Sequence, residues 1–243
     1  MTKSAGTISR SIIITGAPPV QLLDVAGPLE VFSNVRGYDV VVVTTDGSTE
    51  LKTNRGIYLS GTVPHESISG AIDTLIVAGG PGAESGNYEE AYLRWISDAA
   101  RRSRRVASIC TGAFVLAAAG LLDGRRAVTH WKFCARLARE YPKVRVLPDP
   151  IFLGDGPIYT SAGITSGIDL SLALVEEDHG HQTALAVARQ MVRFSCGLAG
   201  RHSTATCSPA RQRRLNRCGS CRSTCSKIFV ATSQSKLWPR GSG

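Results

Sequence analysis

Four short runs of β-branched residues, separated by longer helical patterns, constrain the fold of this 243-residue chain more than any other feature. The runs are continuous rather than alternating, as expected for strands that are buried on both faces of a parallel sheet. Helical patterns between and after them predict a parallel sheet covered by helices on both faces. The runs lie at residues 11–15, 39–45, 73–78 and 105–109, and the helical patterns at 28–34, 89–102 and 111–121.

Proline and glycine mark the expected ends of these elements. Pro28 is expected in the first turn of its helix, and Gly120 and Gly124 are expected at the end of the helix at 111–121. A β-rich stretch follows at 143–160, with a turn predicted at 154–156. Two further helical segments are predicted on either side of Gly180.

The charge of the chain is unevenly distributed. Nine of the 28 Lys and Arg residues lie in 195–243, which contains no Asp or Glu, so the rest of the chain has 19 basic and 19 acidic residues. We therefore expect a neutral globular domain over 10–194, followed by a basic, cysteine-rich and disordered tail over 195–243. The chain shows no bilayer-length apolar run and no secretory signal, which predicts a cytoplasmic protein with reduced thiols and no membrane partner.

Three interpretations of the tail remain open. Cys218, Cys221 and Cys225, with Cys207 and His202 upstream, have part of the spacing of a zinc knuckle but no second well-spaced pair. The arginines would bind nucleic acid by charge alone. The abrupt change of composition at Ser195 fits a shifted reading frame best, and a helix-turn-helix sequence in another frame of the gene would support that hypothesis.

Ligands of open α/β sheets bind where strands end and helices begin. Three turns of this kind stand out, at 20–27, 78–82 and 108–112. In the third, "SICTGA", Cys110 follows a strand and precedes a helix, so small neighbours would leave its thiol exposed above the sheet. The helix amino terminus would lower the pKa of that thiol. The backbone N–H of Thr111, with a second N–H from the Gly79–Gly80 turn, would hold a developing oxyanion.

A reactive and an inert interpretation of Cys110 are equally consistent with this pattern, because free cysteines are among the most buried residues. Cys134 is expected to be an inert core thiol, and His130 a hydrogen-bonded core histidine. His179 and His181 lie two residues apart and do not share a helix face, so we expect no metal site there. The "GGPG" turn lacks the Lys and Ser/Thr of a phosphate loop. No cofactor is expected.

Several long segments carry a resemblance to a known superfamily. The segments "VQLLDVAGPLEVF", "DTLIVAGGPGAE" and "RRVASICTGAFVLAAAGLLDGRRAVTHW", with others over most of residues 11–194, resemble the class I glutamine-amidotransferase-like (PfpI) superfamily. The pattern is most similar to the amino-terminal sensing domain of AraC-type transcriptional regulators. Isonitrile hydratases share much of it. The resemblance implies a flavodoxin-like α/β sandwich and a homodimer.

The resemblance also implies roles for single residues. Cys110 matches the hydratase nucleophile, Asp24 its general acid/base, and Thr111 the neighbour of the nucleophile. An apolar setting would raise the pKa of Asp24 and suit that role, although Asp24 as a cap of the following helix is equally consistent with the sequence. Related hydrolases carry a histidine after the cysteine, so Thr111 argues against a Cys-His hydrolase.

Two functions follow as expectations. The first is a ligand-sensing domain of an AraC-type regulator that lacks its helix-turn-helix domain and binds a small molecule near Cys110. DNA would then be contacted only through the missing domain, or non-specifically through the tail. The second is a cysteine-dependent lyase that hydrates isocyanides. A redox-sensing thiol is a third hypothesis.

Overall fold

The computed structural model describes residues 9–197, with side chains described up to residue 191. Contacts divide the chain into residues 1–187 and 188–243, and every element below belongs to the first unit except the later part of α7. The predictions of a disordered tail, a zinc knuckle and a nucleic-acid contact concern 195–243. Apart from residues 195–197 at the end of α7, that segment lies outside the described residues.

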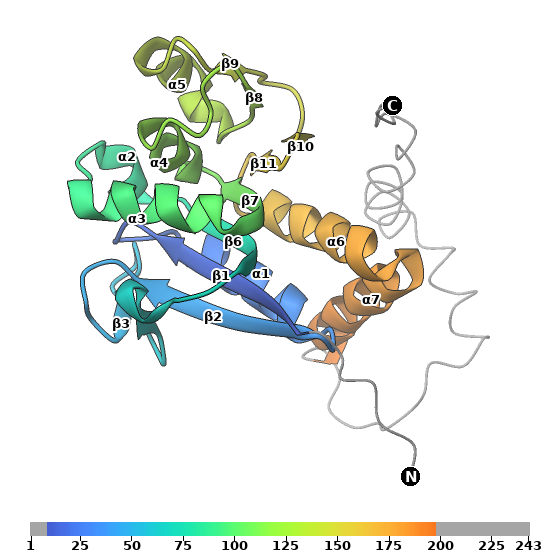
Figure 1. Cartoon of the computed structure of the whole chain (residues 1–243). Helices are drawn as coiled ribbons and strands as arrows, with labels where there is room; N and C mark the ends of the chain where they lie inside the picture. The colour runs from blue at the N-terminus through green and yellow to red at the C-terminus, as the bar shows by residue number, and fades with distance from the viewer. Residues whose placement is uncertain (1–8, 198–243) are drawn as a thin grey trace. The chain divides into compact units, whose positions relative to one another are not determined.

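A seven-stranded sheet forms the centre of the first unit, in the order β10-β11-β7-β6-β1-β2-β5 (Figure 1). Every neighbouring pair is parallel except β10 and β11, which confirms the predicted mostly parallel sheet. The four predicted strands are present: three are longer than predicted by one or two residues, and β2 is shifted by one residue toward the N-terminus. The strands are β1 (Arg10–Gly16), β2 (Tyr38–Thr44), β5 (Val63–Pro64), β6 (Ile72–Ala78), β7 (Ser103–Ile109), β10 (Phe152–Asp155) and β11 (Ile158–Ser161).

Helices cover both faces of this sheet, as predicted. On one face α1 (Leu22–Ser33) packs against α6 (Thr165–His179), and on the other α3 (Glu90–Arg101) and α4 (Gly112–Ala118) pack against β6 and β7 (Figure 1). The short α2 (Pro81–Ser85) contacts α4. After Gly180, whose φ is 81°, the chain continues into α7 (His181–Gly197), so the predicted break between the last two helices is confirmed.

The structure corrects some boundaries. α1 begins six residues earlier than expected, so Pro28 lies inside the helix and not in its first turn. The turn between β10 and β11 lies at residues 156–157 rather than 154–156. Several short elements were not predicted, because two or three residues show no countable period: β3 (Glu50–Lys52), β4 (Tyr58–Ser60), η1 (His65–Ser67), β8 (Arg126–Ala127) and η2 (Trp131–Phe133). The short β9 (Arg145–Val146) lies within the β-rich stretch predicted at 143–160.

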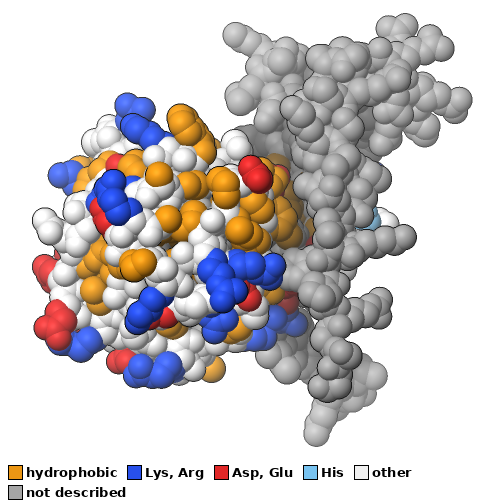
Figure 2. All heavy atoms as spheres, turned by 90° about the horizontal axis from the view of Figure 1, so that it is seen from above, with side chains coloured by type: hydrophobic (Ala, Val, Ile, Leu, Met, Phe, Trp, Pro, Cys, Tyr) orange, Lys and Arg blue, Asp and Glu red, His pale blue; other side chains and the backbone are white. Residues whose placement is uncertain are grey.

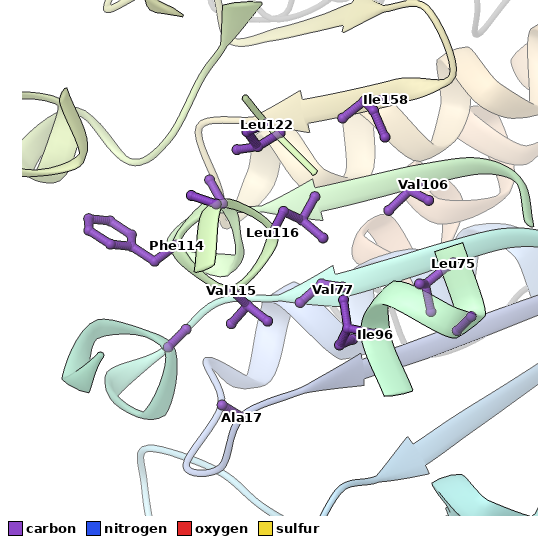
Figure 3. Packing of buried hydrophobic residues seen from close by; sticks show 14 of the residues in the cluster. Ala17, Leu75, Val77, Ile96, Val106, Phe114, Val115, Leu116, Leu122 and Ile158 are labelled. Atoms are coloured by element: carbon purple, nitrogen blue, oxygen red, sulfur yellow. The ribbon is translucent and has the colours of Figure 1, made fainter. Parts of the chain in front are cut away.

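The hydrophobic core between the sheet and the α3–α4 face fixes the position of α4. Leu75 of β6 and Val106 of β7 lie toward Ile96 of α3, while Val115 and Leu116 of α4 pack over the ends of the same strands (Figure 3). These side chains are at most 3% exposed. The start of α4, which follows Cys110, is therefore held by buried packing.

The surface seen in Figure 2 carries Lys and Arg side chains in several separate groups, several of them beside Asp or Glu. Ion pairs of this kind include Arg126 with Asp155 and Lys143 with Asp123. Among the helices that the structure describes, none is long and apolar enough to cross a membrane.

Candidate active site

The centre of the site is the turn between β7 and α4. Cys110 has a φ of 56°, in the left-handed region that residues other than glycine rarely adopt. Its amide donates to the carbonyl of Ser161 (3.0 Å), and its carbonyl accepts from the Thr129 hydroxyl (2.9 Å). Strained residues held in this way cluster at functional sites. The sharp turn predicted around Cys110 is therefore present, and hydrogen bonds from two other segments hold it. The predicted exposure of the side chain is wrong, because Cys110 is buried.

Glycines allow the neighbouring backbone to approach this turn. A Cβ on Gly79 would lie 2.5 Å from the Thr111 nitrogen, and a Cβ on Gly112 would lie 2.1 Å from the Val77 carbonyl oxygen. Gly163, with a φ of 101°, leaves space where a Cβ would lie 2.7 Å from the Cys110 sulfur. Real side chains do not tolerate such distances, so the compact packing around the thiol requires glycine at these positions.

Asp24 of α1 interacts with the thiol and with two backbone amides. One carboxylate oxygen accepts from the Ile164 amide (2.8 Å) and the other from the Gly79 amide (3.2 Å), and the Cys110 side chain also lowers the pKa of this carboxylate. Burial raises the pKa of Asp24 to about 6, against the smaller lowering effect of these bonds. The expected rise is thus confirmed.

The helix-cap interpretation of Asp24 is wrong. Gln21 is the N-cap residue of α1, and its side chain makes no capping hydrogen bond. Asp24 is the third residue of the helix and does not occupy the cap position. Its side chain instead joins the loop after β6 to the loop after β11.

The prediction of a lowered thiol pKa is also wrong. Burial, followed by the negative charge of Asp24, raises the pKa of Cys110 to about 12. The Thr111 amide and hydroxyl act in the opposite direction but do not outweigh these effects. α4 is only seven residues long, and the thiol is 7% exposed, so loss of water determines its charge. The resting side chain is therefore a neutral thiol beside a carboxylate.

Thr111 connects the cysteine turn to the glycine turn. Its hydroxyl accepts from the Gly80 amide (2.9 Å), while the Gly79 amide donates to Asp24. Both amides of the glycine turn thus already have protein partners, and the Thr111 amide remains as the N–H that contacts the sulfur. The five residues selected from the sequence, Asp24, Gly79, Gly80, Cys110 and Thr111, lie together in one site.

Three residues of the site were missed. Gly163 and Ile164 come from the loop after β11, and the "SAG" glycine was the available signal for them. Ile164 has a φ of 53°, which is unfavourable for a β-branched residue. Glu84 of α2 adds a smaller negative charge that also raises the pKa of Cys110.

The remaining candidates lie elsewhere or have structural roles. The Cys134 sulfur lies 3.7 Å from the His130 carbonyl and is only partly buried. The His130 ring accepts from the Lys132 amide and caps η2, so it is not a core histidine. His181 contacts Glu176 (3.1 Å), and His179 packs against the Tyr38 ring. Within the described part of the chain, no group of His, Cys, Asp or Glu could hold a metal ion.

The chain is similar in sequence to an enzyme and to transcriptional regulators. Isonitrile hydratase of Pseudomonas putida is 36% identical over 176 residues, which cover 72% of this chain and 74% of that enzyme. The HTH-type transcriptional regulator CdhR of Pseudomonas aeruginosa is 32% identical over 183 residues. That match covers 74% of this chain but 53% of the regulator, so the chain spans about half of the regulator's length.

Solved structures agree on the fold. Drosophila melanogaster DJ-1beta superposes with a TM-score of 0.68 at 20% identity, covering 76% of this chain and 98% of that one. An AraC family transcriptional regulator from Pseudomonas putida gives a TM-score of 0.65 at 19% identity, covering 75% and 99%. The DJ-1/PfpI family model matches residues 10–177. Because that match spans the whole sheet and the Cys110 turn, the chain belongs to the DJ-1/PfpI family.

Proposed function

We propose that the described domain is a small-molecule-sensing domain of the kind that precedes the DNA-binding part of AraC-type regulators, with its ligand site at Cys110. The observation that carries this proposal is the neutral state of the thiol. A pKa raised to about 12 leaves almost no thiolate at neutral pH, whereas a nucleophile acts as thiolate. The similarity to CdhR and to the AraC family structure supports the same assignment.

A second candidate function is hydration of an isocyanide. It is favoured by the contact between the Cys110 thiol and the Asp24 carboxylate, whose pKa of about 6 suits proton transfer near neutral pH. The sulfur would bond to the isocyanide carbon while the thiol proton passes through Asp24 to that carbon. Water would then add to the same carbon, the carbon–sulfur bond would break, and a formamide and the thiol would be released.

One experiment separates the two candidates. The full chain is screened by thermal shift against a library of small metabolites, and separately incubated with an alkyl isocyanide while formamide is followed by NMR. For a sensing domain we expect compounds that raise the melting temperature and protect Cys110 from iodoacetamide, without turnover of the isocyanide. Cys134→Ala serves as the matched control, because Cys134 lies outside the site.

The outcomes point in different directions. Formamide production that Cys110→Ala abolishes and Cys134→Ala retains would overturn the sensing proposal in favour of the hydratase. Absence of both turnover and any compound that protects Cys110 would contradict both functions.

A further inference from the structure

α2 is fixed directly beside the cysteine turn. The Glu84 amide donates to the Gly80 carbonyl (2.9 Å), and the Gly80 amide in turn donates to the Thr111 hydroxyl (2.9 Å). A Cβ on Gly82 would lie 2.1 Å from the Ala17 carbonyl oxygen, so α2 lies against the loop after β1 without intervening space. Glu84 is therefore held at one position relative to Cys110 by backbone bonds.

The Glu84 side chain differs from that of Asp24. Asp24 is fully buried, and both of its oxygens accept from backbone amides. Glu84 is half-buried, and its carboxylate has no hydrogen bond or ion pair with any described residue. Its charge nevertheless acts on the Cys110 thiol. Glu84 is thus the carboxylate of the site that is available to a ligand.

No basic side chain in the described part of the chain balances these two carboxylates at the thiol. The charges of Asp24 and, to a smaller extent, of Glu84 raise the pKa of the Cys110 thiol, whereas the Thr111 amide and hydroxyl lower it. Glu84 also acts on Arg136, but that guanidinium bonds Glu140 (2.8 Å) and lies over the Phe114 ring at 5.2 Å. The two carboxylates therefore make the potential at the sulfur more negative, and a partly buried setting screens their charges less than bulk water does.

We propose that Glu84 is a specificity-determining residue that, together with Asp24, keeps anions away from Cys110, so that the ligand carries no negative charge. Carboxylates, phosphates and sulfonates are excluded by repulsion, whereas neutral and cationic molecules are accepted. This inference rests on the proposed function, in which the Cys110 turn is the ligand site, and it identifies the charge class of the ligand.

Thiol-specific reagents of opposite charge test the proposal without a known ligand. The full chain reacts with cationic 2-(trimethylammonium)ethyl or anionic 2-sulfonatoethyl methanethiosulfonate. Each forms a disulfide with the thiol and releases methanesulfinate together with the thiol proton. Mass spectrometry of the tryptic peptide 106–125 reports on Cys110 alone, because that peptide contains no other cysteine. The rate of modification of Cys110 by the cationic reagent is divided by the rate for the anionic reagent. This ratio is then divided by the same ratio for N-acetylcysteine, which corrects for the intrinsic reactivities of the two reagents.

We expect the normalised ratio to exceed unity by about threefold to tenfold at low salt and to fall as salt screens the charges. Glu84→Gln should lower the ratio severalfold, whereas Glu89→Gln, which removes an exposed carboxylate just before α3, should leave it unchanged. Iodoacetamide and iodoacetate, which are smaller, give the same comparison between a neutral and an anionic probe.

A normalised ratio near unity, or a ratio that Glu84→Gln does not change, overturns the proposal. Failure of both reagent pairs to modify Cys110 also overturns it if it persists at pH 10, where a thiol with a pKa of about 12 is ionised about as much as an ordinary thiol is near neutral pH. Failure of the charge selectivity can be distinguished from failure of the proposed sensing function. Library compounds that protect Cys110 but are predominantly anionic would support the sensing function and contradict the charge selectivity.

Discussion

At the scale of single residues, the chemistry of the site depends on the interaction between the Cys110 thiol and the Asp24 carboxylate. Burial raises the pKa values of both groups, to about 12 and about 6, so near neutral pH the proton resides on sulfur and the charge on Asp24. A thiolate would form only when that proton moves to another group. Asp24 is placed to receive it, which makes Asp24 the residue that determines whether Cys110 reacts or only binds.

Thr111 gives a prediction at this scale. Its buried hydroxyl is the acceptor for the Gly80 amide, and Thr111→Val keeps the shape of the side chain but removes that acceptor. We expect a loss of about 1–3 kcal/mol in the free energy of unfolding, because the amide is left buried without a partner. Urea denaturation measures the loss. Thr111→Ser, which retains the acceptor, should lose clearly less, and equal losses in the two variants would contradict the role of this bond.

At the scale of elements, the sequence predicts the strands and helices that are long enough to show a period. β1, β2, β6 and β7 were found because their β-branched runs are continuous, and α4 because its small apolar residues follow β7 directly. β3 and β4 were missed, since three residues cannot establish a pattern. α1 was placed too late, because Pro28 was assigned to a first turn.

The same limit explains which part of the site was predictable. The loops after β1, β6 and β7 follow recognisable strands, so Asp24, Gly79, Gly80, Cys110 and Thr111 could be selected from sequence. Gly163 and Ile164 lie after β11, whose parallel pairing with β7 brings Ser161 beside Ile109. That pairing is long-range and leaves no local pattern. The raised thiol pKa was missed for a similar reason, because burial depends on the whole fold.

The carboxyl end of α6 gives a prediction at the element scale. Asp178 accepts from the Tyr38 hydroxyl (2.7 Å), Arg104 (2.8 Å) and Arg105 (2.5 Å), and it also pairs with Arg10. The Asp178 side chain is 3% exposed and that of Arg105 is 2% exposed. These bonds attach α6 to β1, β2 and β7 at the strand ends opposite the Cys110 turn.

Asp178→Asn removes the negative charge from this network and leaves Arg105 buried without its main partner. We expect the free energy of unfolding to fall by about 3–5 kcal/mol, the usual effect of breaking a buried ion pair. Asp98→Asn, which breaks the exposed pair with Arg101, should change it by less than about 0.5 kcal/mol. Similar losses in the two variants would show that burial does not determine the effect.

At the scale of the whole molecule, Asp24 and Asp178 make stability depend on pH in opposite directions. The pKa of Asp178 is lowered to about 2, since hydrogen bonds and arginine charges outweigh the effect of burial. The ionised Asp178 therefore stabilises the fold fully above about pH 3.8, which is the pKa of this group in the unfolded chain. This stabilisation is lost as the pH falls toward about 2. That loss amounts to about 2 kcal/mol, and it should be absent in Asp178→Asn.

Asp24 acts at higher pH with the reverse sign. Its pKa rises from 3.8 in the unfolded chain to about 6 in the folded one, so the folded state binds the proton more tightly. The contribution of Asp24 to the free energy of unfolding is therefore greatest below about pH 4. It decreases as the pH rises through 6, by about 3 kcal/mol in total. Urea denaturation of the wild type and of Asp24→Asn, at pH 4.5 and pH 7.5, measures this dependence.

We expect the wild type to lose more stability than Asp24→Asn between these two pH values, because asparagine carries no proton that the fold must release. The other carboxylates titrate in both proteins and cancel in the difference. A difference of the opposite sign would mean that the two amide bonds to Asp24 outweigh its burial. The carboxylate would then be a stabilising anion of the fold, and Asp24 would be a poor acceptor for the Cys110 proton near neutral pH.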